Sequence, residues 1–237
     1  MITRKLAGAT MVVVGVTLAT PAMGQGFSGP YVSAGIGFKS SDFKLSETDG
    51  PTATGPGTTQ TDSASAKAGG RSVFFGSIAA GWDWNPSGPF VLGFSLFADL
   101  GSSTVAETSG TTVTTGPGGT TVTPSSSEIK QKDRFGIYVE PGYEFTPRTV
   151  GYAKLGWNRS KYQFSDSDPT LPLSSFSATF NGFAYGVGLK HLMTDRLFVF
   201  VEWVQVDYGS KSSTVGTATT TIEPNNSLAL IGAGWRF

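Results

Sequence analysis

Apolar residues alternate with small or polar residues along eight segments of the chain. In residues 229–237 every second side chain is apolar, and the face between them carries Leu230, Gly232, Gly234 and Arg236. A period of two is typical of a β-strand whose two faces meet different environments. The eight predicted strands span residues 31–38, 73–84, 90–100, 134–145, 150–162, 180–192, 197–209 and 227–237. In the seventh strand the alternation fails over residues 204–207, which predicts a bulge.

The connections between these segments alternate in length. Three tight turns occupy residues 85–89, 146–148 and 194–196, and four long polar segments occupy residues 40–70, 102–131, 165–179 and 210–225. Short turns at one end and long loops at the other are typical of transmembrane barrels in bacterial outer membranes. The pattern predicts an all-β fold: an eight-stranded antiparallel up-and-down transmembrane β-barrel with four long extracellular loops and short periplasmic turns.

The first two long loops are rich in threonine, serine and glycine. Residues 111–123 are nearly of low complexity, a composition that buries too little apolar surface to order itself. We therefore expect this loop to be exposed and mobile. The alternative is a polar β-hairpin that extends the barrel and turns at Gly116–Gly119.

The N-terminus has the pattern of a secretory signal peptide. Arg4 and Lys5 precede an apolar run over residues 6–19, and small residues follow as far as Gly24. The run is shorter than the roughly 20 residues of a membrane-spanning helix. We predict a signal peptide over residues 1–24 and a barrel domain over residues 25–237.

Charge and cysteine content restrict the possible functions. The chain has 17 basic and 17 acidic residues, and loss of residues 1–24 leaves 15 and 17, a formal net charge of −2. This near-neutral balance gives no reason to expect nucleic-acid binding. The sequence contains no cysteine, so disulfides and thiolate metal sites are excluded. We find no metal-ligand cluster and no cofactor motif, because none of the three Gly-x-Gly elements continues into a helix.

Charged residues recur on the faces that would line the barrel interior. An eight-stranded barrel is only wide enough to be filled by side chains, so buried charges there must pair. The turn at residues 146–148 places Glu140 opposite Lys154, and the next hairpin makes Lys190 and Glu202 diagonal neighbours. We expect Glu140→Ala to destabilise the barrel and Lys154→Met to repair part of the loss. A salt-bridged core is favoured over a catalytic dyad. The inward set is Asp83, Asp99, Arg134, Glu140, Glu144, Lys154, Lys190, Glu202 and Arg236.

Aromatic residues fall into two groups along the predicted strands. The group at the turn side is Trp82, Trp84, Phe90, Tyr143, Phe145, Trp235 and Phe237, and the group in the opposite half is Phe38, Phe74, Phe135, Trp157 and Trp203. Aromatic rings prefer the headgroup level of a bilayer, so the two groups predict girdles at the two membrane interfaces.

Two alternative functions have some support in the sequence. The first is a narrow passage for small hydrophobic compounds, as in OmpW-like barrels, lined by Val73, Phe75, Phe97, Phe198, Phe200, Leu228 and Leu230. The second is a lipid-modifying enzyme, which would need a Ser-His-acid cluster at the outer rim. His191 is the only histidine, and its predicted place is the lipid-facing side near the periplasmic rim. The enzyme is therefore the weaker alternative.

Three stretches resemble small bacterial outer-membrane barrels, the family of the OmpA transmembrane domain, the opacity proteins and related surface antigens. These stretches are residues 29–37, residues 202–209 with Glu-Trp and Asp-Tyr-Gly, and residues 232–237. The resemblance implies residence in the outer membrane of a Gram-negative bacterium, with outer-membrane lipids and lipopolysaccharide as neighbours. It also implies that Trp235 and Phe237 form an assembly signal for the barrel assembly machinery. We expect a non-enzymatic protein that contributes to outer-membrane structure and presents polar loops, whose extracellular partner the sequence does not identify.

Overall fold

A computed structural model describes residues 26–49, 52–55, 58–60, 63–69, 71–86, 88–116, 119–166, 175–215 and 218–237. The predicted signal peptide lies outside these residues. In the described ranges no helix has the length and hydropathy needed to cross a bilayer. The described strands are β1 (Gly29–Asp49), β2 (Thr52–Gly55), β3 (Thr58–Gln60), β4 (Ser63–Gly69), β5 (Val73–Trp84), β6 (Phe90–Leu100), β7 (Ser103–Gly116), β8 (Gly119–Thr146), β9 (Thr149–Asp166), β10 (Ser175–Leu192), β11 (Leu197–Tyr208), β12 (Lys211–Val215) and β13 (Ala218–Arg236).

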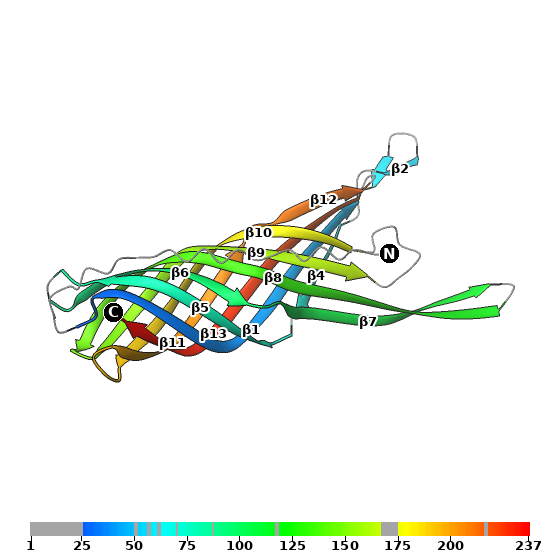
Figure 1. Cartoon of the computed structure of the whole chain (residues 1–237). Helices are drawn as coiled ribbons and strands as arrows, with labels where there is room; N and C mark the ends of the chain where they lie inside the picture. The colour runs from blue at the N-terminus through cyan, green and yellow to red at the C-terminus, as the bar shows by residue number, and fades with distance from the viewer. Residues whose placement is uncertain are drawn as a thin grey trace, which may run out of the picture.

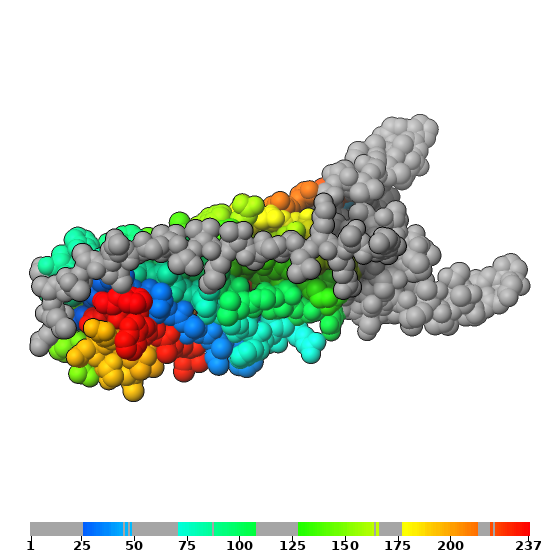
Figure 2. Space-filling model, viewed as in Figure 1, coloured from blue at the N-terminus to red at the C-terminus, as the bar shows by residue number. Residues whose placement is uncertain are grey.

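Eight of these strands close into a barrel, which confirms the predicted fold class. They follow one another in the order β1, β5, β6, β8, β9, β10, β11 and β13, each antiparallel to its neighbour. The barrel closes where β13 pairs with β1 and sets Val32 opposite Trp235. The strands are strongly tilted, and the C-terminus lies at the end with the short turns (Figure 1). In Figure 2 the C-terminal strand and the start of β1 lie side by side at that end.

Alternation places the two faces of each strand in different environments. Along β11 exposed and buried residues alternate over nearly the whole strand. The pairing of β11 with β10 and β13 runs without a register shift as far as Asp207, so the predicted bulge at residues 204–207 is wrong. The apparent break arises because Val204 and Val206 are buried apolar residues of the interior. At these positions apolar side chains face the interior and polar ones face outward, the reverse of the usual arrangement, while the backbone remains regular.

The strands continue well beyond the barrel at the end opposite the turns. β7 and β8 form a long hairpin that sets Gly116 opposite Gly119, and it projects far from the barrel body (Figure 1). The structure therefore has the polar hairpin in place of the expected mobile loop. β1 and β13 also remain paired as far as Asp49 and Ala218. Threonine is frequent in β7, in the first part of β8 and in the first part of β13. Its branched side chain suits an extended strand, which explains how polar sequence continues the ladder.

A bulge in β8 controls which residues face outward near the top of the barrel wall. The register with β9 shifts between Lys132 and Phe135, and Asp133 has a φ of 50°. An extra residue at a bulge changes the parity of the strand on either side. Gln131 and Arg134 are both buried inside the barrel as a result. Lys132 and Phe135 both face outward, although they are three residues apart.

Candidate functional site: the charged barrel interior

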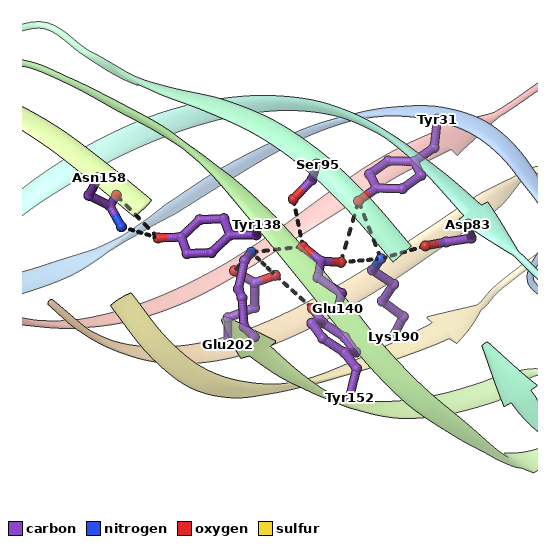
Figure 3. Close-up of polar contacts among 10 residues, drawn as sticks. Tyr31, Asp83, Ser95, Tyr138, Glu140, Tyr152, Asn158, Lys190 and Glu202 are labelled. Carbon is purple, nitrogen blue, oxygen red and sulfur yellow. Dashed lines mark hydrogen bonds and ion pairs between the residues drawn. The ribbon is translucent and has the colours of Figure 1, made fainter. Parts of the chain in front are cut away.

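Two lysines and three carboxylates form the centre of the interior (Figure 3). Lys190 Nζ lies 2.9 Å from Glu140 Oε2 and 3.3 Å from Asp83 Oδ1. Lys154 Nζ lies 2.7 and 2.8 Å from the two carboxylate oxygens of Glu202 and 3.3 Å from Glu140 Oε1. Glu140 therefore bridges the two lysines, one with each oxygen.

Hydroxyl groups and aromatic rings complete this cluster. Ser95 Oγ donates a hydrogen bond of 2.7 Å to Glu140, and the Tyr152 hydroxyl donates one of 2.6 Å to Glu202. Lys190 Nζ lies 4.5 Å from the ring centroid of Tyr31 and 4.8 Å from that of Tyr152. Such cation–π contacts are favourable, most of all for a desolvated ammonium. Lys154 Nζ likewise lies 4.5 Å from the ring centroid of Tyr138. Glu140, Glu202 and both lysines thus have partners beyond the ion pairs.

A second cluster lies farther from the turns. Arg134 Nη1 donates hydrogen bonds of 2.9 and 3.0 Å to the two oxygens of Asp99, and Lys39 Nζ lies 3.5 Å from the same carboxylate. The Arg134 guanidinium lies 4.6 Å from the ring centroid of Phe97, and Lys39 lies 5.3 Å from that of Phe75. Two cations thus share one carboxylate between aromatic walls.

The two clusters balance each other in charge. The central cluster has one carboxylate in excess and the upper cluster has one cation in excess, so four cations face four carboxylates. Their side chains are 9% exposed or less. An uncompensated buried charge is costly, whereas a paired and hydrogen-bonded set is tolerated. The arrangement is a neutral, interlocked network.

The predicted inward charges occupy different parts of this interior. Glu140 contacts Lys154, as the hairpin register suggests. Lys190 and Glu202 keep their diagonal register, but each forms its ion pair with another residue. Lys39 was missed because the first predicted strand ended at residue 38. Counting in steps of two from Tyr31 brings Lys39 to the inner face, and that signal could have found it.

Glu144 and Arg236 lie apart from the network, at the turn end. Glu144 Oε1 accepts a 2.8 Å hydrogen bond from the backbone N–H of Phe27. Arg236 donates hydrogen bonds to the carbonyl oxygens of Gly26 and Asp195. Both residues therefore tie the described start of the chain and a turn to the barrel wall.

Aromatic and aliphatic side chains fill most of the remaining interior. Phe198, Phe200 and Leu230 are buried near the central cluster, and Phe75 and Leu228 are buried as well. A cavity of about 40 Å³ remains among the charged residues. This volume is enough for only a few water molecules. The apolar residues considered as a passage therefore pack as a core.

His191 is separate from the interior. Its side chain is exposed, and its Nδ1 lies 2.9 Å from the Thr149 hydroxyl on the outer surface of the turn end. The interior carboxylates lie on the other side of the wall.

Comparison with known proteins agrees with this architecture. The model of the outer membrane protein β-barrel domain family matches residues 9–237. The chain belongs to this outer-membrane β-barrel family. Similar solved structures include the attachment invasion locus protein Ail of Yersinia pestis in complex with the heparin analogue sucrose octasulfate (15% identity, TM-score 0.40, covering 88% of this chain and 99% of Ail). Others are Neisserial surface protein A (14%, 0.44, 89% and 98%) and OprG of Pseudomonas aeruginosa (14%, 0.46, 90% and 98%). Comparison with curated protein sequences gives no match.

The outer surface of this outer-membrane barrel faces lipid. All members of the two predicted aromatic groups are exposed, including Trp235 and Phe237. Neighbouring strands bring rings together near the turns, as with Phe90 and Tyr143 at 5.5 Å between centroids. In the opposite half, Phe135 and Trp157 lie 6.2 Å apart. The two girdles therefore mark the two edges of the lipid-facing band.

Proposed function

We propose that this protein is a non-enzymatic structural barrel of the Gram-negative outer membrane that presents polar β-hairpins to the outside. The observation that supports this proposal most strongly is the filled interior. Eight paired charges, their hydroxyl partners and the surrounding rings occupy the lumen and leave a cavity of about 40 Å³. A wall supported in this way resists deformation and offers no path for a solute.

The transport alternative has less support. A hydrophobic passage needs apolar residues that line an open space, but Phe198 and Phe200 pack against other rings. Opening a route between the two ends would separate Lys190 from Asp83 and Glu140, which costs several kcal/mol for uncompensated buried charges.

The enzyme alternative lacks a histidine that is suitably placed to act as the general base. His191 is the only histidine of the sequence, and it lies on the outer surface near the turns. Lipid-facing chemistry on the outer leaflet would need its groups at the other end of the barrel. In the described part of the chain, the interior carboxylates and lysines are paired with one another around a cavity of only about 40 Å³.

The proposal includes two kinds of partner. The barrel surface contacts outer-membrane lipids, and its outer half would contact lipopolysaccharide. During biogenesis the C-terminal strand, with Trp235 and Phe237, would engage the barrel assembly machinery. The extended hairpins would be exposed to the extracellular medium.

A deletion strain tests the proposed function. We expect loss of the gene to increase sensitivity to detergents and to bulky hydrophobic antibiotics, and the full-length gene to restore resistance. Uptake of small hydrophobic compounds and the mass of lipid A should remain unchanged. Loss of such uptake with an intact barrier would support transport, and a change in lipid A mass would support an enzyme. Either result would contradict the proposal.

A further inference from the structure

Three cations lie together on the outer surface of β8 and β9. Lys132 is directly opposite Lys161, and one step closer to the turns Arg159 is opposite Phe135. Directly opposite side chains have Cβ atoms about 5 Å apart. The cluster depends on the bulge at Asp133, because regular alternation would turn Lys132 toward the interior with Arg134. We refer to Lys132, Arg159 and Lys161 as the basic patch.

The side chains of the basic patch have no ion pair or hydrogen bond within the part of the chain that the structure describes. Other outward cations at this end differ in this respect. Lys44, Arg71 and Lys130 form ion pairs with Glu223, Glu107 and Glu128. Like charges directly opposite on neighbouring strands are destabilising. The Lys132–Lys161 pair therefore has a cost that nothing described in the chain offsets.

The patch lies at the height of a lipid headgroup. Arg159 and Lys161 follow Trp157 on the same face of β9, about 7 and 13 Å farther along the strand at roughly 3.3 Å per residue. Trp157 and Phe135 belong to the girdle that is distant from the turns. The cations therefore lie just beyond the apolar band.

The surface below the patch is apolar and exposed. Ile137 and Val139 of β8 and Leu155 and Trp157 of β9 are 39% to 53% exposed. Phe183 of β10 lies opposite Trp157 and is 58% exposed. A molecule with anionic groups above fatty acyl chains would complement both regions at once.

We infer that Lys132, Arg159 and Lys161 form a binding site for the phosphorylated head of lipopolysaccharide, whose acyl chains lie on the apolar wall of β8, β9 and β10. Phosphate groups between Lys132 and Lys161 would remove their mutual repulsion. Asn181, which is opposite Arg159 and exposed, adds an amide donor at the same height. This inference goes beyond the proposed structural role and requires only that the barrel resides in the outer membrane.

Lipid binding to the purified, folded full chain in detergent tests the inference. The probes are diphosphoryl lipid A, monophosphoryl lipid A and phosphatidylglycerol, and native mass spectrometry measures the bound fraction. The test variant is Lys132→Gln with Lys161→Gln. The control is Lys44→Gln with Lys211→Gln, which removes the same charge from exposed residues at the same end.

We expect each lost cation of the patch to weaken diphosphoryl lipid A binding about fivefold, and the test variant therefore about 25-fold. The control should remain within about twofold of the unaltered protein. Equal loss in test and control would show general charge attraction and overturn the inference. Binding of phosphatidylglycerol with equal affinity and equal sensitivity to the test variant would also overturn it.

A second measurement needs no ligand. In lipid-free detergent the test variant should unfold at the same or a higher urea concentration than the unaltered protein, because the like-charge pair is relieved. Unfolding at a lower urea concentration would contradict the argument from repulsion.

Discussion

At the scale of single residues, Glu140 connects the two lysines of the central cluster. It is 3% exposed, it contacts both Lys154 and Lys190, and it accepts a hydrogen bond from Ser95. Lys154 retains Glu202 and Lys190 retains Asp83 when Glu140 is removed. Without Glu140 the interior would hold four cations and three carboxylates, so one positive charge would be uncompensated.

Glu140→Ala should lower the free energy of unfolding by about 3–5 kcal/mol, as expected when one member of a buried charge network is lost. Glu107→Ala is the control, because its ion pair with Arg71 is exposed and should contribute less than about 1 kcal/mol. Urea titration of the folded barrel in lipid vesicles, followed by tryptophan fluorescence, measures both. Equal losses in the two variants would contradict the network.

The hairpin register alone suggests that Lys154→Met recovers part of the stability lost in Glu140→Ala. The network changes this expectation. Lys154→Met added to Glu140→Ala restores the balance of charge, but it removes the lysine that binds both oxygens of Glu202. The double variant should therefore be no more stable than Glu140→Ala. Substantial recovery in the same titration would show that Glu140 and Lys154 act as an isolated pair.

Gly188 matters because the Tyr152 ring lies against its backbone. A Cβ at this position would lie 2.3 Å from the ring, whereas a Cβ at Gly76 would meet its nearest neighbour at 3.6 Å. Gly188→Ala should displace the hydroxyl that donates to Glu202 and cost about 1–3 kcal/mol, the usual range for overpacking. Gly76→Ala should be nearly neutral. A Gly188→Ala variant as stable as Gly76→Ala would contradict this packing.

At the scale of elements, the outer part of the β7–β8 hairpin is not needed for the barrel wall to form. Replacing residues 110–125 by Asn-Gly closes a two-residue turn at the Ser109–Ser126 pair. The barrel should fold as before, because among the described residues the removed part pairs only within the hairpin. The test is the heat-dependent shift in gel mobility that distinguishes folded from unfolded barrels. A variant that fails to show the folded band would contradict the separation of hairpin and barrel.

The C-terminal strand gives a prediction about biogenesis. The backbone N–H of Phe237 donates one hydrogen bond to Pro30 at the seam of the barrel, and its side chain is half exposed. Deleting Phe237 should thus cost little folded stability. We propose that the deletion slows insertion of the barrel in cells, because the terminal aromatic serves as an assembly signal. Normal surface levels of the deletion variant, together with normal refolding in detergent, would contradict this role.

At the scale of the whole molecule, the sequence predicts the barrel because lipid and lumen select different residues on alternate positions. Alternation gives no reliable prediction where the lipid-facing and lumen-facing residues are alike in polarity. The polar run at residues 130–134 hides the bulge at Asp133, and inward Val204 and Val206 imitate a bulge that does not exist. The ion pairs of Lys190 could not be predicted, because they join strands distant in sequence that meet only after the barrel closes.

A neutral network of side chains closes the barrel interior. Single-channel recording of the purified, folded protein in a planar lipid bilayer shows whether this interior conducts ions. The structure predicts a silent bilayer, without steady conductance steps, because about 40 Å³ of free space among paired charges offers no continuous path. Reproducible conductance steps that change in size with Glu140→Ala or Lys190→Met would contradict it.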